Sequence, residues 1–437
     1  MKRYLSILLS IVLLAGLLAG CGDSAVTPDS ANGSTAASTD KAVKAAQKMD
    51  LTYWVTTNRQ PNLDIVIPMF EKENPGVTVS PTYYTSGDLR KNLMVAASSN
   101  TLPSFWYQYS GSTASFYPTN GLTYNLNDYA KQHDWEKKFL PGTLELATFD
   151  GILSGYPQTL NTFGMIYRKD IFEANNIKVP TTFAEFEKVL ADLKAAGVAP
   201  FGIGGKGGFD LLRLVSPIVE MYAGSELHDQ MNALKASWNS EPVIKAFTKL
   251  KEWSDKGYFT EGFITQDQND ARMLWYAGKS VMRVDGSPQI QLLNNGDYDM
   301  NQYGYFKLPF IDPNGGSRMI TYITVNQFNV KLTKEELEKS IEFNEFSLSE
   351  NDAFNETKAY PMPYADAVIP KSLPMVDQML ADNAKSGSLL IGDQNMPSEI
   401  IDCYYQADDA VISGLMTPQK AAEFLQKSIE TYLATKK

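Results

Sequence analysis

The side chains that could do chemistry in this sequence do not form a metal site or an activated nucleophile. The chain of 437 residues has two histidines, His133 and His228, which lie far apart. Neither has a neighbour at the spacing of zinc or copper ligands. No histidine accompanies a G-x-S-x-G segment, as serine hydrolase chemistry would require. We therefore predict no catalytic residue, no metal ion and no cofactor.

One glycine-rich segment has the spacing of a dinucleotide-binding loop. Gly202-Ile203-Gly204-Gly205-Lys206-Gly207 reads as G-x-G-x-x-G. That chemistry needs the glycines in the turn that opens the helix of a βαβ unit. The segment lies deep in the chain, and no Ser or Thr follows Lys206 as in a phosphate-binding loop. We interpret it as a loop at a cleft edge, where the backbone can approach a ligand.

Aromatic residues are abundant, with 6 Trp, 23 Tyr and 21 Phe. Several stand at predicted strand ends beside amides: Trp54, Trp106, Tyr109, Tyr156 and Tyr322, with Asn58, Gln108, Gln158 and Asn161. A sugar ring packs its C–H face on such rings, while amides bind its hydroxyl groups. A peptide or another small polar ligand fits the same set. The 50 acidic residues also leave open a pair of carboxylates that cleaves glycans.

The elements around these rings alternate between strand and helix. Residues 51–55 form a β-rich run, and Asn74-Pro75-Gly76 separates the following helix from a strand at 77–79. The helix is predicted from an apolar stripe at i, i+3, i+4 and i+7, namely Leu63, Val66, Ile67 and Phe70. This order predicts a parallel α/β lobe. The rings that end the next strand, 102–107, would lie at the carboxyl edge of its sheet, where such folds bind ligands.

Later helices carry start signals. Thr182 with Glu185 and Thr333 with Glu336 have the spacing of capping boxes, and Thr417 precedes a proline at the first helical position. More than 400 residues follow the first 20. A chain of this length is too long for one core, so we expect two lobes.

The N-terminus resembles an export signal. Lys2 and Arg3 precede an apolar run over residues 5–18, which ends in Leu18-Ala19-Gly20-Cys21. This ending resembles the lipobox of bacterial lipoproteins, in which the cysteine carries lipid. The next residues are polar and aperiodic, as in a flexible linker. The net charge of −11 provides no basic surface for nucleic acid.

Seven stretches in order after the lipobox resemble family 1 extracellular solute-binding proteins, the sugar-capturing lipoproteins of ABC importers that are akin to the maltose-binding protein. They are Tyr53-Trp54 with 70–77, 102–106, 167–172, 180–186, 278–286 and 417–422. The resemblance implies a type II periplasmic-binding-protein fold, with two α/β lobes joined by hinge strands and the ligand between them. It implies a signal peptide at 1–20, a linker at 21–49, a first lobe at 50–159 and 310–330, and a second at 160–309 and 331–437. Hinges are expected near 159–161, 308–310 and 326–330.

The same resemblance implies ligand positions by their place in the family pattern. They are Trp54, Asn58, Arg59, Trp106, Gln108, Tyr109, Gln158, Asn161, Phe209, Asp285, Ser287 and Tyr404. Two departures argue against a long maltodextrin. Ser287-Pro288 replace the stacking tryptophan of maltose-type relatives, and Asn161 replaces their acidic hinge residue.

The function implied by the resemblance is capture of a mono- or oligosaccharide by lobe closure. A monomer tethered through Cys21 to the outer face of the cell membrane would deliver the sugar to the permease of an ABC transporter. A secreted glycan-acting enzyme, a binding protein for a non-sugar solute and an adhesive surface lipoprotein are the alternatives.

Overall fold

The computed structural model describes residues 48–296, 298–311, 318–354, 362–366 and 374–435, which belong to one compact unit, Ala46–Lys437. The predicted signal peptide, the lipobox with Cys21 and the linker up to residue 47 lie outside the described residues.

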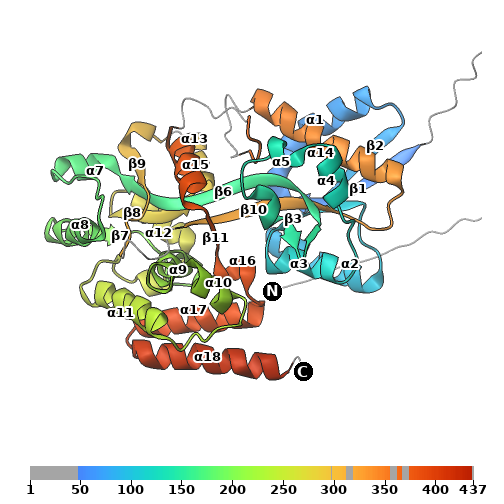
Figure 1. Cartoon of the computed structure of the whole chain (residues 1–437). Coiled ribbons are helices and arrows are strands. Elements are labelled where there is room, and N and C mark those ends of the chain that lie inside the picture. Colours follow the sequence, from blue (N-terminus) through green and yellow to red (C-terminus); the bar gives the residue numbers. More distant parts are fainter. Residues whose placement is uncertain (1–47, 297, 312–317, 355–361, 367–373, 436–437) are drawn as a thin grey trace, which may run out of the picture. The chain divides into compact units, whose positions relative to one another are not determined.

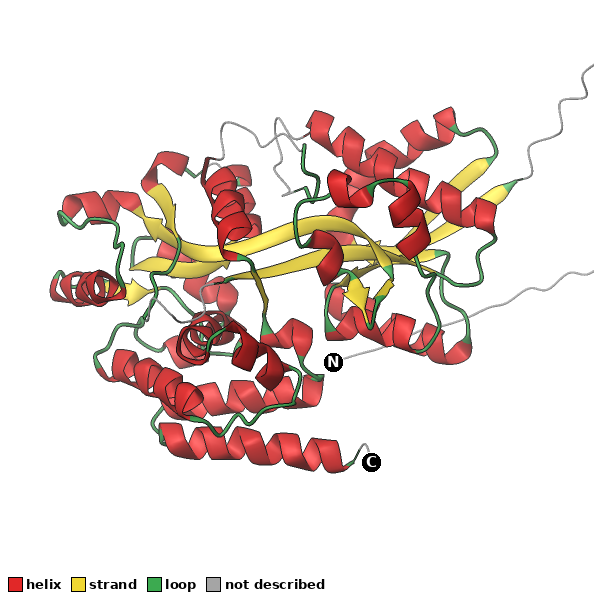
Figure 2. Ribbon diagram, in the orientation of Figure 1, coloured by secondary structure: helices red, strands yellow, loops and turns green. Residues whose placement is uncertain are grey.

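Nine of the described strands form one mixed sheet (Figures 1 and 2). Its main path has the order β2-β1-β3-β10-β6-β8-β7, with β11 beside β10 and β9 beside β6. The strands are β1 (Met49–Thr56), β2 (Val77–Tyr84), β3 (Phe105–Tyr109), β6 (Gly155–Arg168), β7 (Ala199–Phe201), β8 (Ser280–Gly286), β9 (Tyr303–Phe306), β10 (Met319–Phe328) and β11 (Ser388–Leu390). A small hairpin, β4 (Thr148–Phe149) and β5 (Ile152–Leu153), stands apart from it.

The opening βαβ unit forms as the sequence predicts. Helix α1 (Gln60–Glu73) buries the four residues of its apolar stripe, and β1 pairs in parallel with β2. Gly76, between them, has a φ of 97°, which glycine adopts without strain. Strand β3 then pairs in parallel with β1, so the ends of β1 and β3 lie at the same edge of the sheet.

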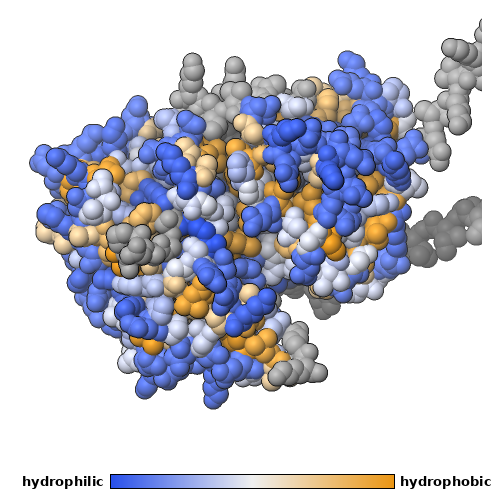
Figure 3. All heavy atoms as spheres, in the orientation of Figure 1, coloured by the Kyte–Doolittle hydropathy of each residue, from blue (hydrophilic) through white to orange (hydrophobic). Residues whose placement is uncertain are grey.

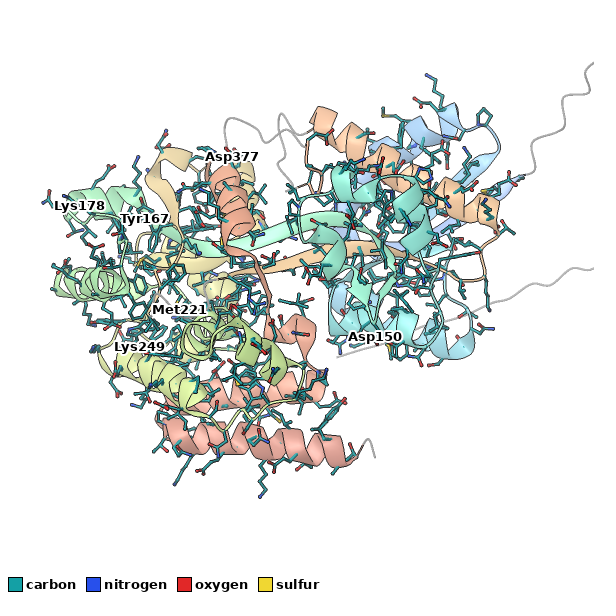
Figure 4. All side chains as sticks on the ribbon, in the orientation of Figure 1. Asp150, Tyr167, Lys178, Met221, Lys249 and Asp377 are labelled. Carbon is teal, nitrogen blue, oxygen red and sulfur yellow. The ribbon has the colours of Figure 1, made fainter. Side chains whose placement is uncertain are left out.

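Two hydrophobic cores share the long strands β6 and β10. In β6, Tyr156 and Leu160 belong to the first core and Phe163 and Met165 to the second. In β10, the change falls between Ile320, in the second core, and Ile323, in the first. Figure 2 shows both strands passing between the two groups of helices. Figure 4 labels Tyr167 on β6 and Met221 on α9, two further members of the second core. The side chains of both strands thus change from one core to the other at these crossover points.

Helices surround each core. The first carries α1, α2 (Ser86–Ser99), α3 (Ser112–Thr119), α4 (Asn127–Gln132), α5 (Trp135–Lys138), α6 (Thr143–Leu146) and α14 (Lys334–Phe354). The second carries α7 (Lys169–Ala174), α8 (Phe183–Ala195), α9 (Phe209–Ala223), α10 (Ser225–Asn232), α11 (Glu241–Asp255), α16 (Gly392–Asn395), α17 (Ser398–Ile412) and α18 (Pro418–Ala434). A third cluster lies behind β6 under α12 (Gln268–Tyr276), α13 (Ser287–Asn295) and α15 (Pro374–Ser386). Three short 3-10 helices, η1 (Thr57–Arg59), η2 (Phe263–Thr265) and η3 (Met300–Gln302), complete the described elements.

The predicted helix caps are present. The Oγ1 of Thr182 accepts from the Glu185 amide and the Glu185 carboxylate accepts from the Thr182 amide, which completes the capping box of α8. Thr333 and Glu336 make the same pair of hydrogen bonds at the start of α14. Thr417 caps α18, in which Pro418 is the first residue.

Helix α14 packs with the first core, whereas the predicted boundaries put 331–437 in the second lobe. Its Phe343 ring lies 5.2 Å from Phe70 of α1 and 6.3 Å from Tyr53 of β1. An amphipathic stripe shows that a helix has a buried face but not which core covers that face.

The described surface is that of an acidic protein with scattered apolar groups. The face drawn in Figure 3 is mostly hydrophilic, with separate hydrophobic patches. Among the described helices, none is both long enough and apolar enough to cross a membrane.

Truncation of Phe343 tests where α14 belongs. Phe343→Ala removes about 3–5 kcal/mol of packing from the first core, so amide exchange should accelerate first in α1 and β1. Hydrogen–deuterium exchange measured by peptide measures the effect. Phe247→Ala, which truncates an equally buried ring in α11, should accelerate exchange in α9 and α11 instead. The same exchange pattern in both variants would contradict the assignment.

Candidate functional site

A cavity of about 340 Å³ lies beside the crossover of β6 and β10. Its lining combines residues of both lobes with residues of the crossing strands: Tyr109, Phe163, Phe209, Arg213, Ile320, Tyr322, Ile391, Asp393 and Gln394. Four of the nine are aromatic. The wall therefore presents flat apolar rings together with a few charged and amide groups, as in binding sites for small polar ligands.

The rings of the cavity form a series of contacts across the sheet. Tyr109, at the end of β3, has its ring centroid 6.0 Å from that of Tyr322 on β10. Tyr322 in turn lies 5.6 Å from Phe163 on β6. On the other side, Tyr109 lies 5.7 Å from Tyr107, whose ring is 5.4 Å below the guanidinium of Arg59. The series links the end of the first strand to the cavity.

Arg213 is held between aromatic faces. Its guanidinium carbon lies 3.8 Å from the Phe209 ring centroid and 4.6 Å from that of Phe163. The side chain is 7% exposed, and Nη1 lies 3.5 Å from Asp285 and 3.7 Å from Asp210. Stacking on rings and pairing with carboxylates offset the loss of hydration of a buried guanidinium.

Behind Arg213, a second arginine joins the two aspartates. Arg283 donates from Nη2 to Asp210 at 3.2 Å and to Asp285 at 3.3 Å. Arg272 approaches Asp285 to 3.9 Å. Burial alone would raise the pKa of Asp285, but these three arginines together hold it below its usual value. Asp285 is therefore an ionised, structural partner of Arg213.

The glycine-rich loop completes this buried charge network. The Gly202 carbonyl accepts from Arg283 at 2.5 Å, and the Gly204 amide donates to Asp210 at 3.3 Å. At the start of α9, a Cβ on Gly208 would lie 2.3 Å from the Tyr405 ring. The glycines thus permit close packing against the protein's own groups, and the loop leads into the helix that carries Phe209 and Arg213.

Asp393 lies in α16, directly after β11. The side chain is partly exposed, but its Oδ1 is buried and has no hydrogen-bond partner among the residues that the structure describes. Burial raises the pKa of this carboxyl to about 6, and the charge of Arg213 offsets part of that rise. An unsatisfied acceptor in a cavity wall is available to a ligand.

The cavity contains some of the predicted ligand residues or lies next to them. Tyr109 and Phe209 line it, and Asp285 pairs with Arg213. Asn161 stands opposite Tyr322 in the β6–β10 ladder, so both side chains share one face of the sheet. Arg59 contacts the ring of Tyr107, which in turn contacts the ring of Tyr109 in the cavity wall.

Trp106 and Gln108 lie on the opposite face of β3 from Tyr109, because side chains alternate along a strand. Trp106 is fully buried, its ring is 5.0 Å from Tyr117 of α3, and its Nε1 donates to Gln327 at 3.2 Å. Gln108 is buried as well and accepts from the Tyr109 amide. The structure assigns both residues to the first core and not to the cavity.

The other predicted residues also lie outside the cavity wall. Gln158 sits at the bulge between β6 and β10 and donates to Asn344 of α14 at 2.9 Å. Trp54 packs against Tyr84, Asn58 is exposed and Ser287 is buried. Tyr404 is fully buried, with its ring 4.9 Å from Trp238.

The sequence interpretation did not select Arg213, Asp393 or Tyr405. Arg213 lies within the long apolar run of α9, where an isolated charge that is buried is itself a signal. Tyr405 follows Tyr404 and points about 100° away from it around α17, toward Gly208. Asp393 lies in a four-residue helix with no pattern that marks it.

A larger cavity of about 740 Å³ is lined by α3, α6 and β4 on one side and by Arg318, α15 and β11 on the other. Phe149 is the one aromatic residue in this lining, and no predicted ligand residue contributes to it. Arg318 is already paired with Glu220 and Asp229. The smaller cavity is therefore the candidate ligand site.

Gly111 and Gln394 form a contact between the lobes. Gly111 precedes α3 and borders the large cavity, whereas Gln394 of α16 borders the small one. A Cβ on Gly111 would lie 1.5 Å from the Gln394 carbonyl oxygen. The contact between α3 and α16 (Figure 1) therefore requires glycine at this position.

Comparison with known proteins identifies the family of this chain. The family model for bacterial extracellular solute-binding proteins matches residues 66–368. The chain belongs to this family. Membership confirms the resemblance seen in the sequence and places the protein among extracellular binding proteins.

Two curated relatives of this solute-binding protein match over part of their length. One is an ABC transporter extracellular-binding protein of Pyrococcus horikoshii, 26% identical over 248 residues. The other is the multiple sugar-binding protein of Streptococcus mutans, 25% identical over 261 residues. Each alignment covers 56% of this chain, which spans 56% and 58% of the two relatives.

Solved structures confirm the predicted two-lobe α/β fold. A chitin oligosaccharide binding protein superposes with a TM-score of 0.77 at 22% identity, covering 88% of this chain and 98% of the other. The binding protein RafE in complex with raffinose gives a TM-score of 0.70 at 19% identity, covering 87% and 98%. At sequence identities this low, the similarity to these structures establishes the fold and not the ligand.

Trp106→Ala should damage the fold of the solute-binding protein. Removing this fully buried ring leaves a cavity and takes away the donor to the Oε1 of Gln327, at a cost of about 3–5 kcal/mol in the free energy of unfolding. Denaturant titration followed by circular dichroism measures the loss. A loss below about 1 kcal/mol would contradict the burial seen here.

Gly111→Ala should hinder approach of the lobes while leaving each core intact. The added methyl group would overlap the Gln394 carbonyl, so α3 and α16 could not reach their present distance. Small-angle scattering of the ligand-saturated variant should give a larger radius of gyration than wild type. Gly121→Ala is the matched control, because Gly121 also has a positive φ of 65° but nothing within 4 Å of the added atom. Equal effects of the two changes would point to backbone strain instead of the contact.

Proposed function

We propose that the protein captures a neutral mono- or oligosaccharide in the cavity and delivers it to the permease of an ABC transporter. The observation that carries this proposal is the cavity wall, in which Tyr109, Phe209 and Tyr322 stand beside polar groups with unused hydrogen-bonding capacity. Rings pack on the C–H faces of sugars, and charged or amide groups bind the hydroxyls.

The charges around the cavity favour an uncharged ligand. Arg213, Arg272 and Arg283 stand against Asp210, Asp285 and Asp393, which leaves no excess of either sign when all are ionised. An ionised ligand would lose hydration on entry without a counter-charge to replace it. A neutral polyol meets no such penalty.

Names of related proteins support the same class of ligand. The relative in Streptococcus mutans is called a multiple sugar-binding protein, and the structural neighbours bind chitin oligosaccharide and raffinose. The family is one of binding proteins, so we propose that this protein binds its sugar without converting it.

The mechanism that we propose is closure around the ligand. Tyr109 belongs to the first lobe, whereas Phe209, Arg213 and Asp393 belong to the second. A sugar that touches both sets stabilises the closed form by the contacts made only there. One chain supplies both sides of the site, so a monomer suffices.

We also propose that Cys21 carries the lipid and holds the protein at the outer face of the cell membrane. The lipobox and the polar residues after it support this placement. A tether that confines the loaded protein to the surface raises its effective concentration at the permease.

A saccharide screen tests the function. Thermal unfolding in a panel of neutral mono- and oligosaccharides should show stabilisation by one class, about 2.7 kcal/mol when the free sugar is at a hundred times its Kd. For that sugar, Tyr109→Ala and Phe209→Ala should each weaken binding by about 2 kcal/mol, roughly thirtyfold in Kd by calorimetry. Tyr298→Ala, outside the cavity, is the control.

Two results would overturn the proposal. One is stabilisation by none of the saccharides. The other is steady release of smaller sugars, detected by chromatography at a rate proportional to protein concentration, which would favour the glycan-acting enzyme.

A further inference from the structure

Arg213 enters the cavity with most of its donors unused. A guanidinium has five N–H groups. Among the described residues, its one hydrogen bond runs from Nη1 to Asp285 at 3.5 Å, at the limit of an ordinary bond. The side chain as a whole is 7% exposed. The donors that it does not use within the protein are available to a ligand in the cavity that Arg213 lines.

Asp393 offers the complementary group in the same wall. Its buried Oδ1 accepts no hydrogen bond from the described residues. Both residues line the cavity, and the charge of Arg213 acts on the Asp393 carboxyl. The cavity thus has an unused donor set and an unused acceptor, with the rings of Tyr109, Tyr322 and Phe209 around them.

We infer that Arg213 and Asp393 form the polar anchor of the site and bind two neighbouring hydroxyl groups of one sugar ring. This inference rests on the proposed function and identifies the residues that would determine specificity. One hydroxyl accepts from Arg213 and its neighbour donates to Asp393 as a carboxylate. An anionic ligand would satisfy Arg213 but be repelled by Asp393, and a cationic ligand would meet the reverse. A vicinal diol satisfies both.

Because the anchor uses Asp393 as a carboxylate, sugar binding depends on whether the Asp393 carboxyl is protonated. The groups that face Asp393 are Arg213 from α9, Tyr109 from β3, Tyr322 from β10 and Tyr405 from α17. Burial raises the pKa of Tyr322 and of Tyr405, so neither phenol ionises near neutral pH. Asp393 is thus the member of this set that changes charge near pH 6.

The direction in which sugar affinity changes with pH follows from the hydroxyl group that donates to Asp393. A hydroxyl that donates to the carboxylate stabilises the ionised form, so the pKa of Asp393 is lower with the sugar bound than without it. Sugar affinity is then full above the pKa of the free site, about 6, and falls as the pH decreases below it. The decrease is at most about tenfold per pH unit for one proton.

The experiment uses calorimetry of the full chain with the saccharide that gives the largest thermal shift in a panel of galactose, xylobiose, diacetylchitobiose and raffinose. Asp393→Asn keeps the shape of the side chain but removes its charge, and should raise the Kd roughly 10- to 100-fold at pH 7.5. Its Kd should be flat between pH 5 and 7.5, whereas that of wild type rises toward pH 5.

Asp409→Asn is the matched control. Burial raises the pKa of Asp409 to about 6 as well, and its Oδ1 also has no partner among the described residues, but it does not line the cavity. Its Kd and pH profile should match wild type.

Monodeoxy forms of the bound sugar test the diol directly. Two adjacent positions should lose affinity when the hydroxyl is removed, one through Arg213 and one through Asp393. The loss at the second position should disappear in Asp393→Asn, because the partner is already absent. At the position bound by Arg213, the variant Arg213→Lys keeps the positive charge but not the planar guanidinium. It should therefore reduce the difference in affinity between the sugar and its monodeoxy form.

The possible results distinguish failure of the Arg213–Asp393 anchor from failure of sugar capture itself. Binding that is unchanged in Asp393→Asn, or that strengthens toward pH 5, overturns the anchor and leaves sugar capture standing. Absence of binding by every saccharide overturns both. A ligand-free check uses thermal unfolding: Asp393→Asn should be more stable than wild type at pH 8 and equal to it at pH 4, because the variant has no buried carboxylate. Reduced stability at both pH values would show a structural role instead.

Discussion

The pairing of β6 with β10 is the interaction on which the rest of the structure depends. These antiparallel strands are shared by both cores, and their side chains change from one core to the other within a few residues. At the crossover, Phe163 and Tyr322 turn toward a space that neither core fills completely. The candidate ligand site thus lies where two packed interiors end. The same strands connect its two sides.

Burial of charge gives this space its chemistry. Arg213 in the cavity wall and Arg283, Asp210 and Asp285 behind it are each at most 7% exposed, and isolated ions there would be strongly unfavourable. Mutual pairing satisfies Asp285 and Arg283, whose hydrogen bonds also hold the glycine-rich loop. Arg213 is paired least completely and instead stacks between Phe209 and Phe163. The network thus fixes the position of a guanidinium without using up its hydrogen bonds.

Local sequence signals predicted local structure well. The capping boxes, the βαβ opening and the start of α18 depend on neighbours within a few residues, so spacing alone identifies them. The lobe to which α14 belongs could not be predicted in that way, because the rings on which Phe343 packs, Tyr53, Phe70 and Phe105, are more than 200 residues away in the chain. An apolar stripe contains no information about the partner core.

In the candidate site as well, the sequence predicted the approximate location of residues but not which neighbouring side chains face the cavity. Of the residues chosen by their position in the chain, Tyr109 and Phe209 line the candidate cavity and Asp285 pairs with Arg213, yet Trp106 and Tyr109 cannot both face the cavity from one short strand. Tyr404 and Tyr405 differ by one helical step, and only the packing of Trp238 shows which of them is core. Periodicity could have ruled out one member of each pair, but the choice between them needs the third dimension.

Helix α16 contains both a charged residue of the cavity wall and the residue that meets the other lobe. Asp393, in the cavity wall, is followed directly by Gln394, whose carbonyl meets the backbone at Gly111 in the other lobe. These two residues are joined by a single peptide bond. In the mechanism that we propose, a ligand held at Asp393 favours the position of α16 in which the contact with α3 forms. Because ligands shift such equilibria only through contacts that differ between the two forms, the proposed polar contact at this short helix would favour the closed arrangement of the two lobes.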